Sequence, residues 1–331
     1  MTNKIIKISL VLQMFVILAF GQTKVGTTAG QFLGIGVGAR SVGMGGAVTA
    51  NLSDASDIFW NVGWLGRHER NEVLFHYSRW FADINFQYLS SVIVIPGAGN
   101  LGISIMNLDY GTMERTTETD WETGETFGAQ DLMLGLSFGR KLTNNFSIGG
   151  TVKTVMQKIW HETAWGVAAD IGTIYDVNWR NSRIGVSISN FGTKMKMAGR
   201  DLTIYHDPDG ESEGNNDQIP ATIETDKWNL PITFRIGFST DLIDTKNFAS
   251  TISVDAIHPN DNTECLNLGL EFVFSNMLYL RTGYQGLLGE ENQNRLAGGF
   301  GVKFGNYSID YAYAVHAILQ NTQHLQFRMF F

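Results

Sequence analysis

The last nine residues, Gln323-His324-Leu325-Gln326-Phe327-Arg328-Met329-Phe330-Phe331, indicate the fold because apolar and polar side chains nearly alternate along them. Successive side chains of a β-strand point to opposite faces, so Leu325, Phe327, Met329 and Phe331 share one face. An apolar outer face with a polar inner face is typical of a strand in an outer-membrane β-barrel. We therefore predict that Phe327, Met329 and Phe331 form a C-terminal signal for the barrel-assembly machinery.

The composition agrees with a chain of many strands rather than of membrane helices. The 331 residues include 37 glycines but only 5 prolines, and the mean hydropathy of −0.05 is too low for a helical membrane protein. One apolar run, from Ile8 to Phe20, follows Lys4 and Lys7 and is too short to span a bilayer. We interpret residues 1–21 as a signal peptide, which directs the chain to the outer membrane of a Gram-negative bacterium.

Charge and cysteine content exclude several classes of protein. Cys265 is the only cysteine, so an intramolecular disulfide and a cysteine-based zinc site are excluded. The net charge of −8 argues against nucleic acid as a partner. We expect neither a cofactor nor a metal ion as a required component.

From residue 72 onward, apolar and polar residues alternate in fourteen runs separated by turn residues. An even number of strands is expected of a bacterial single-chain barrel. The runs cover about 72–82, 84–95, 99–109, 128–139, 145–158, 163–176, 181–191, 229–241, 247–258, 264–274, 277–285, 294–304, 306–315 and 323–331. Aromatic residues near run ends, predicted to lie at the membrane interfaces, are Trp80, Trp160, Trp165, Trp179 and Tyr284. The fold class is therefore predicted as all-β, a transmembrane antiparallel barrel formed by residues 72–331.

The connections between these runs are asymmetric. If both termini are periplasmic, every periplasmic turn is short, and the two long connections, 110–127 and 192–228, lie on the outer side. Both long connections are rich in acidic residues. Clustered carboxylates in 207–217 are also compatible with calcium, but the spacing is not that of an EF-hand, and a solvated loop is the preferred interpretation.

Residues 22–71 do not resemble a barrel strand. They are rich in glycine, and small residues let backbones approach closely in a crowded space. The glycine spacing is not that of a dinucleotide-binding loop, and no βαβ pattern surrounds it. We predict that this segment is a hatch inside the barrel lumen.

The stretch GARSVGMGGAVTANLSDASDIFWNVGWL, which starts at Gly38, resembles the N-terminal signature of the PorV/PorQ family of outer-membrane proteins. That family is related to the FadL-type transporters of long-chain fatty acids. The matching positions are Gly38, Ala39, Arg40, Gly43, Met44, Gly45, Gly46, Ala47, Asp54, Ala55, Ser56, Trp60 and Asn61. Val62-Gly63-Trp64 departs from the family, which generally has Pro-Ala-Gly there.

The resemblance implies a fourteen-stranded barrel with a lumen hatch, associated with the type IX secretion system of Bacteroidota. Its partners would then be secretion-system components and secreted cargo proteins, besides outer-membrane lipids and the assembly machinery. The alternative is a FadL-like transporter of hydrophobic small molecules. A transporter requires an apolar pocket of ligand size, whereas a docking protein requires a blocked lumen and a groove on the outer loops.

Side chains that suggest chemistry are few. His76 and Ser78 share one strand face, but a polar pair is the preferred interpretation, and we expect no enzyme. Charged residues predicted to face the lumen and to pair across it are Lys153, Asp170, Arg235, Asp255, Glu271, Arg281, Asp310 and Arg328. Arg40 of the hatch is expected to pair with one of these carboxylates, because an unpaired charge in a closed lumen is costly.

Overall fold

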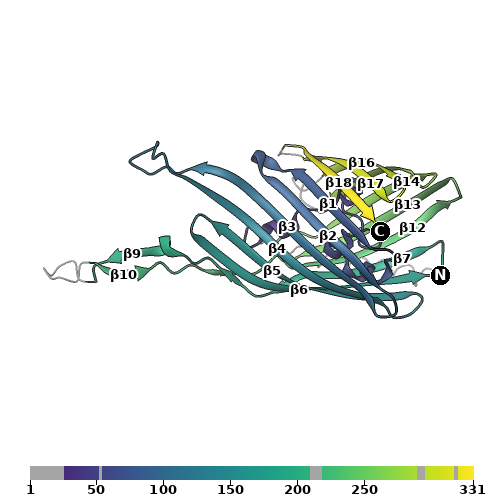
Figure 1. Ribbon diagram of the computed structural model, residues 1–331, viewed down its shortest axis with the longest axis horizontal. Helices are drawn as coiled ribbons and strands as arrows, with labels where there is room; N and C mark the ends of the chain where they lie inside the picture. The colour runs from purple at the N-terminus through teal and green to yellow at the C-terminus, as the bar shows by residue number, and fades with distance from the viewer. Residues whose placement is uncertain (1–25, 52–53, 209–217, 289–294, 317–319) are drawn as a thin grey trace, which may run out of the picture.

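The computed structural model describes residues 26–51, 54–208, 218–288, 295–316 and 320–331 (Figure 1). Fourteen antiparallel strands close into one barrel, in the order β1-β18-β17-β16-β15-β14-β13-β12-β7-β6-β5-β4-β3-β2. They are β1 (Glu72–Arg79), β2 (Asn85–Ile95), β3 (Gly99–Glu114), β4 (Thr126–Lys141), β5 (Phe146–Ile159), β6 (Glu162–Val177), β7 (Ser182–Gly192), β12 (Thr233–Asp244), β13 (Phe248–Pro259), β14 (Cys265–Phe274), β15 (Leu278–Leu287), β16 (Arg295–Phe304), β17 (Tyr307–His316) and β18 (Thr322–Phe330). The predicted fold class and strand number are confirmed.

The barrel closes where the first and last strands pair. β1 and β18 are antiparallel from Glu72 opposite Phe330 to Arg79 opposite Gln323. Closure pairs every strand edge, which a barrel needs where no water can satisfy its backbone.

Alternation along each strand separates an apolar outer face from a more polar inner face. On β18, Leu325 and Phe327 point outward and are 50% and 41% exposed, whereas Gln326 and Arg328 point inward and are buried. Leu136, Ile171 and other large apolar residues are likewise exposed on the outside, as on a lipid-facing surface. No helix among the described residues is long and apolar enough to cross a membrane.

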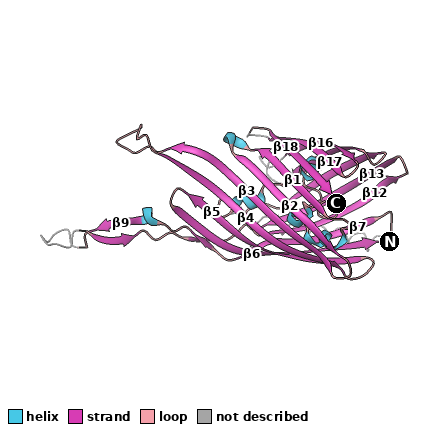
Figure 2. Cartoon of the chain, viewed as in Figure 1, coloured by secondary structure: helices cyan, strands magenta, loops and turns pink. Residues whose placement is uncertain are grey.

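The two ends of the barrel differ, as Figures 1 and 2 show. At one end, here called the short-turn end, the connections are tight, such as that between β2 and β3. At the other, the long-loop end, β3 and β4 extend beyond the barrel. The connection from β7 to β12 also projects there, and it contains the paired strands β9 (Thr203–His206) and β10 (Ile219–Thr222).

The long connections contain more strand than their sequence suggests. The predicted loop 110–127 is partly a hairpin, because pairing resumes after an irregularity and joins Thr112 to Gly128 and Glu114 to Thr126. In the connection from β7 to β12, two-residue strands β8 (Met195–Lys196) and β11 (Lys227–Trp228) pair with each other and flank β9 and β10 in sequence. Such short pairs give too little alternation to be recognised in sequence.

The N-terminal segment, defined here as the described residues between 26 and 71, lies inside the barrel. It forms four short helices, η2 (Gln31–Gly34), α2 (Ala39–Gly43), α3 (Asp57–Trp60) and η3 (Val62–Arg67). α2 contacts β15 to β18, and η3 contacts β3 to β7 on the opposite wall. The predicted signal peptide, residues 1–21, lies outside the described residues.

Candidate functional site

Inward-facing glycines let the N-terminal segment lie directly on the barrel wall. A Cβ on Gly283 of β15 would lie 2.1 Å from Gly45 N, and one on Gly149 of β5 would lie 2.2 Å from Val62 O. A Cβ on Gly172, Gly185, Gly237 or Gly269 would lie 2.1, 2.3, 2.8 or 2.6 Å from the nearest atom of the segment. Real Cβ atoms do not approach other atoms to such distances, so these positions require glycine wherever the two backbones touch.

The glycines of the sequence signature serve the same contact from the other side. Gly38, Gly45 and Gly46 have φ of 85°, 64° and 72°, in a region that side chains with a Cβ rarely adopt. A Cβ on Gly45 would also lie 2.6 Å from Tyr284 N. The turn after α2 can therefore follow the wall only with glycine.

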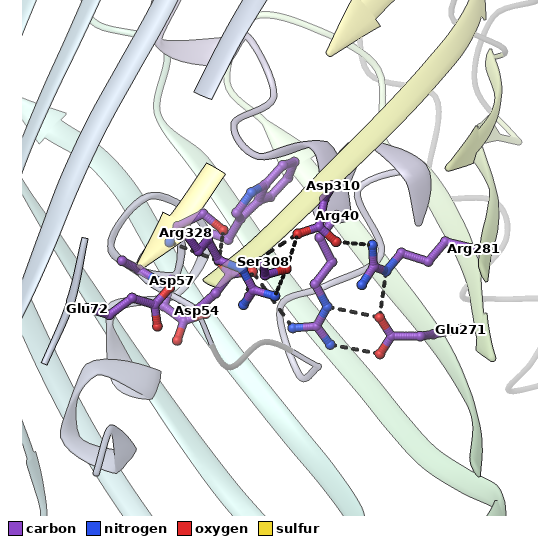
Figure 3. Close-up of polar contacts among 12 residues, drawn as sticks. Arg40, Asp54, Asp57, Glu72, Glu271, Arg281, Ser308, Asp310 and Arg328 are labelled. Carbon is purple, nitrogen blue, oxygen red and sulfur yellow. Dashed lines mark hydrogen bonds and ion pairs between the residues drawn. The ribbon is translucent and has the colours of Figure 1, made fainter. Parts of the chain in front are cut away.

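Arg40 joins the N-terminal segment to the wall through a buried ion network (Figure 3). Its guanidinium donates two hydrogen bonds to Glu271, with Nε–Oε2 and NH2–Oε1 distances of 3.0 and 2.9 Å. Arg281 donates to Glu271 at 2.7 Å and to Asp310 at 2.6 Å. Arg328 lies 3.6 Å from both Asp310 and Asp54 of the segment.

The electrostatics of this network favour its charged state. Burial alone would lower the pKa of Arg40, but the charge and hydrogen bonds of Glu271 raise it. Burial likewise disfavours the Asp54 carboxylate, yet the charges of Arg328 and Arg40 hold its pKa below the usual value. The network therefore stays ionised and holds the segment in place.

The remaining signature residues fix the backbone of the segment. Trp60 Nε1 donates to Val37 O at 2.8 Å. Asn61 Nδ2 donates to Thr49 O and to Thr173 O of the wall, while its Oδ1 accepts from Gly63 N at the start of η3. Gly63, where the chain departs from the family pattern, lies against Thr173. Ala39, Gly43 and Met44 are buried between the segment and the wall.

A second buried pair, Asp57 and His68, lies nearer the short-turn end. His68 Nε2 is 2.7 Å from Asp57 Oδ2. Burial raises the pKa of Asp57 to about 6, although the hydrogen bond from His68 opposes this shift. Burial disfavours charged His68, but its hydrogen bond to Asp57 and the charges of Asp57 and Glu72 raise its pKa. Asp57 and His68 also line a pocket of about 380 Å³ at the short-turn end.

Most of the inward-facing charges predicted from sequence are paired, with two exceptions. Besides the network above, Lys153 Nζ lies 2.7 Å from Asp170 Oδ2. Asp255 accepts instead from the backbone N–H groups of Val48 and Thr49. Arg235 forms no ion pair with any carboxylate in the described part of the chain, so its predicted pairing is wrong.

Arg235 lines a cavity of about 460 Å³ at the long-loop end. The floor is the start of the N-terminal segment, with Phe32 and Ile35. The β1–β3 side contributes apolar and aromatic residues, among them Trp80, Ile84, Leu108 and Tyr110. The β12–β16 side is more polar, with Arg235, Gln285 and Arg295.

Trp80 is the residue whose role the sequence least reveals. Its expected place at the membrane interface is wrong, because β1 ends at Arg79 and the indole packs edge-to-face on His316 and His324, which point inward. Trp80 lines the large cavity, a smaller one of about 40 Å³ and a groove of about 710 Å³ at β1, β17 and β18. Tyr77, Tyr311 and Leu325, which line this groove, point outward from the barrel.

Other sequence candidates lead to no assembled site. His76 Nε2 is 3.1 Å from His324 Nδ1, and Ser78 Oγ makes no hydrogen bond to any described residue. No three His, Cys, Asp or Glu side chains in the described ranges could hold a metal ion. Most of the acidic stretch 207–217 lies outside the described residues. Phe327 and Met329 lie on the outward face of β18, and Phe331 follows it.

No protein-family model and no curated protein matches the chain. Solved structures do match. The toluene transporter TodX of P. putida is 12% identical, with a TM-score of 0.56 over 89% of this chain and 99% of that chain. The CymD monoaromatic hydrocarbon channel is 13% identical, with a TM-score of 0.59 over 89% and 98%. At such identities the likeness establishes the fold. No match supports the PorV/PorQ resemblance.

Proposed function

We propose that this chain is an outer-membrane protein that admits small hydrophobic molecules. The observation that carries the proposal is the unequal filling of the lumen. In the short-turn half the N-terminal segment lies backbone to backbone on the wall, and a pocket of about 380 Å³ lined by charged residues such as Asp57, His68 and Glu72 lies at its end. The long-loop half holds a cavity with apolar floor and wall residues. A concave, partly apolar cavity with a few polar groups is the usual form of a small-molecule site. The matched folds include a toluene transporter and a monoaromatic hydrocarbon channel, which supports the same class of solute.

The orientation follows from the ends of the barrel. Outer-membrane barrels have short periplasmic turns and longer extracellular loops, so the cavity would open to the outside. The N-terminal segment would then be a hatch that closes the periplasmic side. Outer-membrane lipids and the barrel-assembly machinery are the partners that this location implies.

Trp80 suggests the route by which a solute leaves the cavity. The sealed half blocks a straight path, and Trp80 is shared by the cavity, the small chamber behind it and the groove on the outer surface. The chamber of about 40 Å³ holds only a few water molecules. A ring-sized solute therefore passes only when the indole moves, and Trp80 would act as the gate.

Uptake by cells tests the proposal. A Gram-negative host whose outer membrane limits toluene entry would carry the full chain, and radiolabelled toluene would be followed over time. We expect faster uptake than in cells with empty vector, and slower uptake with Gly34→Phe. Gly34 lines both the cavity and the chamber, and a Cβ there meets nothing within 4 Å, so the larger ring fills the route without straining the fold.

Leu136→Phe on the lipid-facing surface is the matched control and should leave uptake unchanged. Trp80→Ala should raise uptake several-fold. Uptake at the empty-vector rate, from cells with normal amounts of folded barrel, would refute transport.

The secretion-related function implied by the PorV/PorQ resemblance would use the projecting hairpins rather than the cavity. Exposed Trp121 and Tyr205 lie in these extensions. Affinity purification from the outer membrane separates the two functions, since co-purified secreted proteins would favour docking. Our proposal includes no catalytic step.

A further inference from the structure

Two arginines in the cavity distinguish it from a binding site for neutral hydrocarbons. Arg235 of β12 and Arg295 of β16 both line it. Neither forms an ion pair with any carboxylate among the described residues, whereas Arg40, Arg281 and Arg328 in the sealed half all do so. A buried cation without a counter-charge is costly, so the arrangement requires an explanation.

Arg235 is the more enclosed of the two, with 8% of its surface exposed. Its NH1 donates to Ser189 Oγ at 3.3 Å, its guanidinium lies over the Trp60 ring at 5.4 Å, and its Nε has no hydrogen-bond partner. The nearest acids are engaged elsewhere: Asp170 with Lys153, and Asp255 with the backbone of Val48 and Thr49. One donor of a buried guanidinium is thus unsatisfied.

Arg295 adds a second positive charge on the same side. Arg235, Arg295 and Cys265 of β14 line the same cavity. One carboxylate, Asp261, also lines the cavity, but it accepts hydrogen bonds from Thr28 and Gln31 at 2.6 Å. The β12–β16 side of the cavity is therefore cationic.

The opposite side offers rings and aliphatic groups. Trp80, Tyr110 and Phe32 contribute aromatic surface, next to Ile84 and Leu108. The Tyr110 hydroxyl donates to Asp131 at 2.9 Å, so its hydrogen-bonding capacity is already used. An aromatic body would pack on this side while its charged group faced the arginines.

We propose that the cavity binds an aromatic carboxylate, with the carboxylate on Arg235 and Arg295 and the ring against Trp80 and Phe32. Guanidinium and carboxylate match in planar geometry, and charge-assisted hydrogen bonds are the strong ones. The ligand supplies a carboxylate in direct contact with the guanidinium groups, which neither arginine has among the described residues; Asp255 and Asp170 act on Arg235 only from beyond ion-pair distance. This inference rests on the proposed uptake function for its biological meaning, but the binding event stands apart from transport.

Calorimetric titration of the full chain in detergent micelles tests the inference. The probes are para-butylbenzoate, neutral butylbenzene and decanoate. We expect para-butylbenzoate to bind more tightly than either of the others. Arg235→Gln and Arg295→Gln should each weaken its binding roughly tenfold or more, while butylbenzene binding stays the same.

Two variants serve as controls. Arg200→Gln removes an exposed arginine outside the cavity and should leave binding unchanged. Arg235→Lys keeps the charge but loses the planar fork, so affinity should fall between those of the wild type and Arg235→Gln. Gel mobility before and after heating shows that each variant is folded, and the Lys variant keeps the test informative if Arg235→Gln fails to fold.

Equal affinity for butylbenzene and para-butylbenzoate would overturn the inference. An equal loss of affinity for both probes in Arg235→Gln would overturn it too. Tighter binding of decanoate would overturn the assignment of an aromatic body. If carboxylate binding behaves as expected but cells show no toluene uptake, the proposed function fails and the binding site stands. If toluene enters cells and the arginine variants bind all probes like wild type, only the inference fails.

Discussion

The two halves of the lumen are built from the same fourteen strands but differ in packing and in the pairing of their charges. In the short-turn half, the N-terminal segment touches the wall backbone to backbone, and Arg40, Glu271, Arg281, Asp310 and Arg328 form a continuous network of charges. In the long-loop half, a cavity lies between the segment and the wall. Arg235 and Arg295 line this cavity, and neither has an ion-pair partner among the described residues. The first half is sealed for stability, and the second keeps space and charge for a ligand.

The largest expected effect comes from breaking the seal. Gly283→Val would place a Cβ 2.1 Å from Gly45 N and Met44 C, so one backbone must move. We expect a loss of about 4 kcal/mol or more in the free energy of unfolding, or failure to assemble. Urea titration in lipid vesicles, followed by gel mobility, measures it.

Gly298→Val is the matched control on the next strand, because a Cβ there has no neighbour nearer than 3.8 Å. It should fold like wild type. Equal behaviour of the two variants would show that close contact between segment and wall is not what stabilises this half.

The second effect tests the paired charges. Arg40→Leu leaves buried Asp54 and Glu271 with fewer counter-charges, and removing one partner of a buried ion pair typically costs about 3–5 kcal/mol. Arg79→Leu removes a pair with Asp83 in which both side chains are exposed, so its cost should stay below about 1 kcal/mol. A similar loss in both variants would contradict a special role for the buried network.

Sequence predicts the two halves unequally, for physical reasons. Strand alternation and turn length follow from local periodicity, and the pairing of Arg40 follows from the cost of a lone buried charge. The structure agrees with all three, since Arg40 pairs with Glu271. The cavity of the long-loop half forms where side chains from strands distant in sequence fail to meet. No local sequence pattern therefore indicates that Arg235 is unpaired. Trp80 shows the same limit, because its aromatic character predicts an interface, while the turn after β1 directs the ring inward.

A third prediction addresses the unpaired charge. Arg235→Leu removes a guanidinium with one hydrogen bond and one ring contact, but it also removes the cost of burying that charge. The two contributions nearly cancel, so stability should stay within about 1 kcal/mol of wild type or rise. Urea titration under the conditions used for Arg40→Leu measures the contrast. A loss as large as that of Arg40→Leu would mean that Arg235 has a stabilising partner and that the cavity of the long-loop half is not preformed to bind an anion.

The smallest expected effect is a pH dependence within the sealed half. The folded pKa of His68 lies above its unfolded value, so His68 contributes stability below about pH 6.5 and loses it as pH rises through the folded pKa. Asp57, with its pKa raised to about 6, contributes in the same direction at lower pH, since the folded state holds its proton longer. The stability difference between wild type and His68→Asn should therefore shrink between pH 6 and 8.5 in urea titrations. The difference between wild type and Arg40→Leu should change less over that range, because Arg40 acts on Asp57 more weakly than His68 does and the pKa of Asp54 is held below its usual value. A constant difference for His68→Asn would show that His68 stays neutral and only packs in this half.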